Sequence, residues 1–114
     1  MNPLPVPRRG DLVWLDFTPP AGHEQTGRRP ALILSPERYN RKTGLALACP
    51  ITNQAKGYPF EVSLPAGLTI TGIVLSDHVR SIDWRARRAA RAGKADEDTL
   101  AEVVGKLTAL ISEE

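Results

Sequence analysis

Two residues at the ends of apolar runs have side chains suited to phosphate chemistry. Arg29 stands before Pro30 and the apolar run 31–34, and Thr52 ends a second run, 45–52. If these runs are antiparallel neighbours in a sheet, both side chains reach one pocket. A guanidinium matches two phosphate oxygens at once and stabilises charge that develops on them, and a hydroxyl beside it supplies a further hydrogen bond. The pair predicts an anion or phosphate site. The alternative is a solvated hairpin loop whose arginines only improve solubility.

Other polar and aromatic residues stand close to this pair in the sequence. Glu24 lies in the polar loop before Arg29, and the polar segment 54–58 follows Thr52. Aromatic rings offer flat faces on which unstacked RNA bases are held. The candidate rings are Trp14, Phe17, Tyr58 and Phe60. Core packing is the other interpretation of each ring, and it is the preferred one for Trp14 and Phe60.

Catalysis by histidine, cysteine or a metal ion has weaker support. His23 and His78 are candidate acid–base groups, but a lone histidine in a loop more often has no catalytic role. Cys49 lies in the apolar run 45–49, where a small buried hydrophobe is a better interpretation than a nucleophile. Two histidines and one cysteine offer no ligand cluster, so no metal site is expected.

Composition limits the class of protein. The chain has 114 residues, 41% hydrophobic and 25% charged, which is ordinary for one globular domain over 1–114. No apolar run approaches the ~20 residues of a membrane helix. The N-terminal segment lacks the apolar stretch of a signal peptide. One cysteine allows no internal disulfide, so a reducing cytoplasm is the expected compartment.

The charges are unevenly distributed, although the net charge is only +2. One segment contains a single acid, Asp83, and six cations, Arg80, Arg85, Arg87, Arg88, Arg91 and Lys94. Acidic residues follow it, from Asp96 to Glu114. A basic segment in a nearly neutral protein indicates a surface for a polyanion or an acidic partner. The alternative is a solvated basic face, which is the commoner outcome for a run of charges.

The elements expected to position these residues are mainly short strands. Apolar runs and alternation predict strands over 11–17, 31–34, 45–52, 58–64 and 71–75. Pro30 suits the first strand position because it has no N–H for a ladder. Ser35 as N-cap and Pro36 after it predict one helical turn over 35–40. Residues 79–84 either continue the last strand or begin a helical turn.

An amphipathic helix is expected at the C-terminus. Asp96 is a good N-cap, with acidic residues in the favourable first turn. The apolar residues of one helical stripe are Leu100, Val103, Val104, Leu107, Leu110 and Ile111. Several short strands followed by one helix predict a mainly β fold of the α+β class, a small, partly open β-barrel with the helix packed against it.

Several ordered segments resemble the MazF/PemK toxin family. They are residues 10–17, 24–25, 27–31, 34–36, 39–40, 42–44, 50–52, 56–62 and 81–87. The segments occur in the family's order and cover nearly the whole chain. The resemblance implies an SH3-like barrel with helices that forms a homodimer. It also implies a ribosome-independent endoribonuclease that uses no metal and no cofactor, the toxin of a toxin–antitoxin pair.

The resemblance also assigns roles to residues. The family's catalytic arginine and threonine fall on Arg29 and Thr52, and its loop glutamate falls on Glu24. The expected RNA contacts are Phe17, Gln25, Arg28, Gln54, Lys56, Tyr58, Arg80, Arg85 and Arg87. The implied substrate is single-stranded mRNA, and the implied partner is a cognate antitoxin whose acidic tail covers the RNA groove.

The expected mechanism is transesterification, in which the ribose 2′-OH attacks the adjacent phosphate and leaves a 2′,3′-cyclic phosphate and a 5′-OH. Arg29 would neutralise the phosphorane and could also protonate the leaving oxygen. Thr52 would hydrogen-bond a non-bridging oxygen, and Glu24 would orient or deprotonate the 2′-OH. Two positions depart from the family pattern, Asn53 and His78. Together with the loop residues Thr26 and Arg28, they leave the recognised RNA sequence open.

Two alternatives to the endoribonuclease remain. One is a non-catalytic relative on the same fold that poisons DNA gyrase. Such proteins lack the arginine–threonine pair, so the match at Arg29 and Thr52 argues against it. The other is a plain RNA-binding barrel that has lost cleavage.

Overall fold

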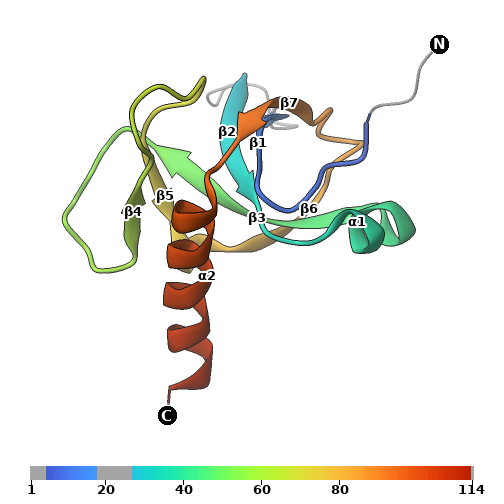
Figure 1. Ribbon diagram of the computed structural model, residues 1–114. Coiled ribbons are helices and arrows are strands. Elements are labelled where there is room, and N and C mark those ends of the chain that lie inside the picture. Colours follow the sequence, from blue (N-terminus) through green and yellow to red (C-terminus); the bar gives the residue numbers. More distant parts are fainter. Residues whose placement is uncertain (1–4, 18–26, 114) are drawn as a thin grey trace.

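The structure, a computed structural model, describes residues 5–17 and 27–113 (Figure 1). Within these ranges the strands are β1 (Asp11–Asp16), β2 (Arg28–Ile33), β3 (Leu45–Thr52), β4 (Glu61–Ser63), β5 (Ile73–Leu75), β6 (Arg80–Asp83) and β7 (Ala90–Lys94). The helices are α1 (Glu37–Thr43), the short 3-10 helix η1 (Ser76–His78) and α2 (Glu97–Ser112). The fold is therefore mainly β with a C-terminal helix, as the sequence predicts.

The strands form an open antiparallel sheet built around β3. Six strands follow one another in the order β4-β5-β3-β2-β1-β7. The seventh strand, β6, is outside this order and pairs only with β3. The first half of β3 pairs with β6 and its last two residues pair with β5. Because β4 and β7 stand at opposite ends of the order, the sheet curls without closing, and the prediction of a partly open barrel is confirmed.

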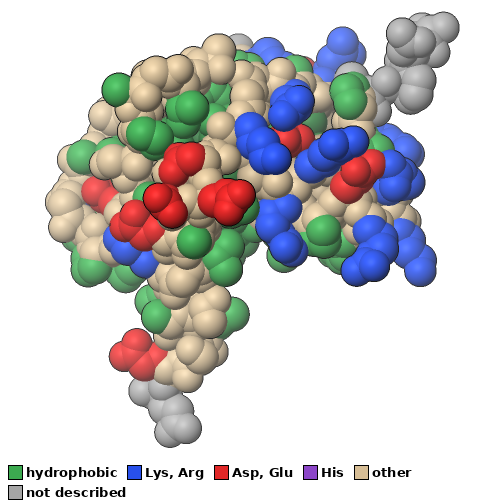
Figure 2. Space-filling model, viewed as in Figure 1, with side chains coloured by type: hydrophobic (Ala, Val, Ile, Leu, Met, Phe, Trp, Pro, Cys, Tyr) green, Lys and Arg blue, Asp and Glu red, His purple; other side chains and the backbone are tan. Residues whose placement is uncertain are grey.

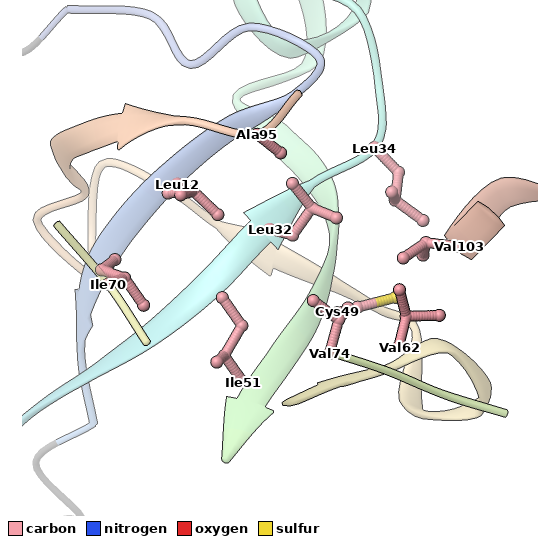
Figure 3. Close-up of a cluster of buried hydrophobic side chains, with 10 residues drawn as sticks. All are labelled: Leu12, Leu32, Leu34, Cys49, Ile51, Val62, Ile70, Val74, Ala95 and Val103. Atoms are coloured by element: carbon pink, nitrogen blue, oxygen red, sulfur yellow. The ribbon is translucent and has the colours of Figure 1, made fainter. Parts of the chain in front are cut away.

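Both faces of the central strands are buried. One cluster consists of Leu12, Leu32, Leu34, Cys49, Ile51, Val62, Ile70, Val74, Ala95 and Val103 (Figure 3). The other contains Val13, Leu15, Ala31, Ile33, Ala46, Ala48, Ile82, Trp84 and Ala89. Successive side chains of a strand point to opposite faces, so Leu12 enters the first cluster and Val13 the second. Burial on both faces holds β1, β2 and β3 rigidly in place.

Cys49 is a buried part of the first cluster, as predicted. Its side chain is fully buried, and its Sγ lies 3.8 Å from the carbonyl oxygen of Ser76. Desolvation by burial, with a smaller contribution from Asp77, raises the pKa of the Cys49 thiol to about 12. A protonated, buried thiol is a packing residue and a poor nucleophile.

Strand β2 begins earlier than predicted. It runs from Arg28 to Ile33, so Pro30 is its third residue and lies opposite Trp14 of β1. The pairing with β3 covers only the segment from Ala31 to Ile33. Pro30 therefore stands where β2 has one paired neighbour, which is where a residue without an N–H is tolerated.

Three other strands differ from the prediction, and a fourth, β6, decides between the two alternatives for residues 79–84. Residues 79–84 contain the strand β6, not a helical turn, and β4 and β5 are shorter than the runs 58–64 and 71–75. Strand β7, Ala90–Lys94, was not predicted, because its arginine, lysine and glycine carry no strand pattern. Its conformation comes from pairing with β1, with which it forms a ladder containing a bulge.

Helix α1 starts later and ends later than the predicted turn over 35–40. Its N-cap is Pro36, and no side chain caps it, so the prediction of Ser35 as N-cap is wrong. Ser35 Oγ donates instead to Oδ1 of the buried Asn40, at 2.6 Å. The helix continues to Thr43 and ends at Gly44, whose φ of 74° is easily adopted by glycine.

Helix α2 has the predicted N-cap, because the carboxylate of Asp96 accepts the N–H of Thr99 at 3.1 Å. The predicted apolar stripe is buried only in part. Val103 is fully buried, whereas Leu110 is 42% exposed and Ile111 is 76% exposed. The reason is visible in Figure 1, where the C-terminal half of α2 extends beyond the sheet. The stripe is longer than the surface that the sheet offers to it.

Candidate functional site

Arg29 and Thr52 meet at one edge of the β2–β3 ladder. The antiparallel register pairs Ala31 with Pro50. Two residues further toward the same end stand Arg29 and Thr52, which line the same pocket of about 230 Å³. They also line an adjoining pocket of about 460 Å³. The predicted convergence of these two side chains is therefore confirmed.

The first pocket has an apolar floor and a cationic rim. Its floor includes Leu15, Ala31, Ala48 and Ile82 from the core cluster behind the sheet. Its rim includes Phe17, Arg29, Thr52 and Arg80. An apolar floor lowers the local dielectric constant, so the guanidinium groups at the rim attract an anion more strongly than they would in open water.

The second pocket lies on the other side of the pair and is more polar. Besides Arg29, Pro30, Ile51 and Thr52, its lining comprises Trp14, Arg28, Asn53, Thr69, Ile70 and Thr71. Trp14 is 36% exposed here, so the preference for core packing of this ring is wrong. The core cluster covers this face of β1 at Leu12 but does not extend to Trp14. Phe60, the other ring assigned to the core, is half-buried.

The ring of Phe17 lies beside two guanidinium groups. The Cζ of Arg87 is 4.5 Å from the ring centroid and the Cζ of Arg80 is 5.5 Å from it. Arg85 is separate from these two, since its Cζ lies 4.8 Å from the ring centroid of the buried Trp84. The structure thus brings Arg80 and Arg87 together on the ring of Phe17. Phe17 and Arg80 line the first pocket, whereas Arg85 lies elsewhere.

Arg28 precedes Arg29 in β2 and is bonded to protein groups. Its Nη1 donates to Asp16 Oδ1 at 2.9 Å. Its Nη2 donates to the carbonyl oxygens of Trp14, at 3.1 Å, and Arg88, at 2.8 Å. The guanidinium of Arg28 therefore ties β2 to β1 and to the turn before β7.

The loop after Thr52 is held by a carboxylate. Glu61 Oε1 accepts the N–H groups of Lys56, at 3.3 Å, and Gly57, at 3.1 Å. The Thr52 hydroxyl oxygen accepts the N–H of Gln54 at 3.1 Å. The side chains of Gln54, Lys56 and Tyr58 are exposed beside the site and are outside the lining of both pockets. Glu61 is a supporting residue that the sequence alone did not indicate.

Some predicted residues are not at these pockets. Glu24, Gln25, His23 and Thr26 lie outside the described residues. His78 is exposed in η1, with its Nε2 3.7 Å from Asp77 Oδ2, and lines neither pocket. Sequence reasoning also missed Thr69 and Thr71, which reach the second pocket from a loop far away in the chain. No local pattern distinguishes such residues from ordinary loop residues.

Two further findings concern the described ranges only. No group of three or more histidine, cysteine, aspartate or glutamate residues there is arranged to hold a metal ion. No helix in residues 5–17 and 27–113 has both the length and the apolar character needed to cross a membrane.

The charges separate on the surface. In Figure 2 the lysine and arginine side chains gather on the right half of this face, over the part of the molecule that contains α1, β6 and β7. The acidic side chains gather near the start of α2. The charges that are separated along the sequence are thus also separated on the surface, which favours attraction of a polyanion to the basic side.

The chain is similar to known proteins along nearly its whole length. It is 50% identical over 106 residues to the endoribonuclease toxin MazF of Escherichia coli, covering 93% of this chain and 95% of that protein. It is 39% identical over 108 residues to the endoribonuclease PemK of Escherichia coli, covering 91% of this chain and 81% of that protein. A crystal structure of MazE-MazF from Deinococcus radiodurans matches with a TM-score of 0.91 and 62% sequence identity, covering 96% of this chain and 98% of that one.

The family model described as the PemK-like, MazF-like toxin of type II toxin–antitoxin systems matches residues 8–111. This match spans each of the seven strands in the described part of the chain and nearly all of α2. With the open antiparallel sheet, the C-terminal helix and the pockets shared by Arg29 and Thr52, it leads to one conclusion. The chain belongs to the PemK-like, MazF-like toxin family of type II toxin–antitoxin systems.

Proposed function

We propose that this chain is an endoribonuclease toxin that cleaves single-stranded RNA at the site formed by Arg29 and Thr52. The observation that carries the proposal is that these two side chains, from adjacent antiparallel strands, line the same two adjoining pockets. Membership in the family supports it, because relatives at 50% and 39% identity are named endoribonucleases.

In the proposed reaction the RNA supplies its own nucleophile. The ribose 2′-oxygen forms a bond to the adjacent phosphorus, the bond between phosphorus and the 5′-oxygen breaks, and a 2′,3′-cyclic phosphate and a 5′-OH result. The guanidinium of Arg29 binds the non-bridging oxygens and neutralises the charge that grows on them. The hydroxyl of Thr52 donates a hydrogen bond to one of these oxygens. Since no water molecule has to be activated as a nucleophile, this chemistry requires no metal ion and no cofactor.

Two protons move in this reaction. We assign Glu24, which lies outside the described residues, to accept the proton of the attacking 2′-OH. The leaving 5′-oxygen must gain a proton in return. Because an arginine guanidinium holds its protons tightly, we assign Arg29 an electrostatic role and take this second proton from solvent.

The two pockets suggest a path for the RNA. They lie on either side of Arg29 and Thr52, so a strand crossing from one pocket to the other brings a phosphate onto the pair. Arg80, Arg87 and Phe17 would hold one flank of the strand by charge and by stacking. The remaining proposed contacts are Gln25, Gln54, Lys56, Tyr58 and Arg85.

The proposed antitoxin partner follows from the same charges. The Deinococcus radiodurans structure similar to this chain is of MazE together with MazF. For this chain we propose a cognate antitoxin whose acidic tail lies over the RNA groove. Carboxylates bind the same guanidinium groups as phosphates do, so the antitoxin and the RNA would compete. We expect the protein in the cytoplasm, where mRNA is present.

An apolar groove beside α2 supports a homodimer. Its lining residues are Arg9, Leu34, Leu47, Glu97, Leu100, Ala101, Val104 and Leu107. Leu47 and Val104 are about two-fifths exposed, at 40% and 39%. A twofold interface brings the same patch of both subunits together, and Arg9 and Glu97 at the rim would then meet opposite charges. Equilibrium sedimentation of the wild type and of Leu47→Glu tests this, since the glutamate would place charge in the interface and yield monomers.

The experiment that tests the function is incubation of purified protein with a long single-stranded RNA in the presence of EDTA. We expect discrete fragments with 5′-OH ends from the wild type. We expect intact RNA from Arg29→Ala, and cleavage reduced by about ten- to a hundredfold in Thr52→Val, which loses one hydrogen bond to a charged group. Intact RNA from correctly folded wild-type protein, across varied sequences, would contradict the proposal and favour RNA binding or a gyrase target.

A further inference from the structure

We propose, building on the endoribonuclease function above, that Arg28 is a positioning residue that fixes the RNA-facing ends of β1 and β2. It lines the second pocket beside Arg29 and is an obvious candidate for a phosphate contact. Its hydrogen bonds point to another role. The guanidinium is already bonded to three acceptors of the protein.

These bonds join three segments. Nη1 of Arg28 donates to the carboxylate of Asp16, which lies opposite Arg28 in the β1–β2 register. Nη2 donates to two main-chain carbonyl oxygens, those of Trp14 in β1 and Arg88 in the turn before β7. A planar guanidinium with five N–H donors fits several acceptors in one plane, which a lysine ammonium does not do with the same geometry.

The segments joined by Arg28 are also bonded to each other beside Phe17, which lines the first pocket. The N–H of Asp16 donates to the carbonyl oxygen of Arg87 at 2.7 Å. Nη1 of Arg87 donates back to the carbonyl oxygen of Asp16 at 3.2 Å. The next residue, Phe17, lies beneath the guanidinium of Arg87. Loosening the bonds of Arg28 would therefore displace Phe17 and Arg87 and also the neighbouring Arg29.

The backbone at Arg88 supports this account. With a φ of 52°, Arg88 is the one non-glycine residue with a positive φ among the described residues. This conformation is uncommon for a side chain of this kind and marks a turn that its surroundings hold in place. The Arg88 side chain is 75% exposed, and its Nε is 3.8 Å from Asp16 Oδ2. Arg88 is therefore held mainly by its main chain, whose carbonyl oxygen lies 2.8 Å from Arg28 Nη2.

The test separates positioning from direct RNA binding. Single-turnover cleavage at saturating protein is measured for the wild type, Arg28→Ala, Arg28→Lys and Asp16→Asn. The affinity for the same RNA with a 2′-deoxy nucleotide at the cut position is measured over a range of salt concentrations. Arg38→Ala is the control. Arg38 is exposed on α1 and lines neither pocket, so this variant also loses one positive charge but at a distance from the site. Circular dichroism establishes that each variant is folded.

A positioning role predicts that Arg28→Ala lowers the saturated cleavage rate at least tenfold. The slope of log affinity against log salt should be the same for Arg28→Ala as for Arg38→Ala. Arg28→Lys falls between the wild type and Arg28→Ala, because its ammonium keeps the charge and loses the planar set of bonds. The double variant Arg28→Ala/Asp16→Asn is no slower than Arg28→Ala, because both changes remove the same restraint.

The opposite pattern would overturn the proposal. If Arg28 contacts a phosphate, Arg28→Ala lowers the slope of log affinity against log salt by about one unit relative to Arg38→Ala and leaves the saturated rate near wild type. If Arg28→Ala does not fold, Arg28→Lys and Asp16→Asn decide between the two roles, by the saturated cleavage rate and the salt dependence of RNA affinity. A wild type that cuts no RNA would instead contradict the endoribonuclease function itself.

Discussion

The main chain at Gly72 packs directly against the main chain at Thr52. A Cβ atom built on Gly72 would lie 2.6 Å from the carbonyl oxygen of Thr52, far inside normal contact distance. The backbone of Gly72 has a φ of +132°, which side chains rarely adopt. Gly72 precedes β5, whose residue Ile73 pairs with Thr52 in the sheet. A residue far from Thr52 in the sequence thereby determines where Thr52 sits.

We predict that Gly72→Ala lowers the RNA cleavage rate about ten- to a hundredfold, because small displacements of a reacting group are costly. The matched control is Gly67→Ala, which also introduces a side chain at a positive φ, of +95°, but with no atom within 4 Å. Both variants lose stability through backbone strain, and only Gly72→Ala moves Thr52. Equal cleavage rates for the two folded variants would show that Gly72 does not position Thr52.

The arginines beside Phe17 give a prediction about binding. Arg80→Ala and Arg87→Ala should each weaken binding of an uncleavable RNA and reduce the slope of log affinity against log salt by about one unit. Arg85→Ala should have a smaller effect, because its guanidinium lies over Trp84 and away from both pockets. Salt titrations of the three variants measure this. If the slope of log affinity against log salt were the same for all three variants, the whole basic segment would attract RNA and no defined RNA path over Phe17 would exist.

A buried polar network gives a prediction about stability. Asn40 is fully buried; its Nδ2 donates to the carbonyl oxygens of Pro7, at 2.8 Å, and Ser35, at 3.0 Å. Asn40→Ala leaves these groups without partners, so we expect a loss of roughly 3 kcal/mol in the free energy of unfolding. Thr43→Ala removes exposed hydrogen bonds of the Thr43 hydroxyl with Tyr39 and Leu45 at the end of the same helix, and it should cost less than about 1 kcal/mol.

Urea unfolding at one protein concentration measures both of these variants. The Asn40 variant should still cleave RNA at low temperature if it is folded, because Asn40 lines neither pocket. A loss of stability as small as that of Thr43→Ala would show that the network is not important for the fold.

Burial of Cys49 gives a prediction about pH. The thiol has a pKa of about 12 in the folded protein, raised from an ordinary value of 9.0. The unfolded chain therefore releases this proton at lower pH than the folded protein does. The stabilising contribution is fully present below pH 9 and is lost as the pH rises toward 12, by at most about 1.4 kcal/mol per pH unit.

Replacing Cys49 by alanine should remove this part of the pH dependence of the free energy of unfolding. The free energy of unfolding between pH 8 and pH 11, measured for both proteins, checks this expectation. Parallel curves for the wild type and Cys49→Ala would contradict it.

The sequence carries much of the fold because local patterns and tertiary packing agree in the centre of the sheet. The apolar runs of β1 and β3 and the cap at Asp96 are local signals, and the structure confirms them. The convergence of Arg29 and Thr52 was also predictable, because it needed only two adjacent antiparallel strands.

What could not be predicted depends on contacts distant in the sequence. Strand β7 has no strand-like residues of its own and is set by pairing with β1. Trp14 is exposed because the core cluster ends before it reaches that part of β1. The supporting contacts of Arg28 and Gly72 join segments that no sequence pattern connects. The roles of Glu24 and Gln25 stay predictions, since both lie outside the described residues.

The central claim is that Arg29 and Thr52 promote attack by a ribose 2′-OH on the adjacent phosphate. The most direct measurement uses the RNA sequence that the protein cuts, prepared as DNA with a single ribonucleotide on the 5′ side of the cut phosphate. With EDTA present, we predict cleavage of this strand to a 2′,3′-cyclic phosphate and a 5′-OH, and no cleavage of the all-DNA strand or by Arg29→Ala. Cleavage of the all-DNA strand, or products carrying a 5′-phosphate, would contradict the account.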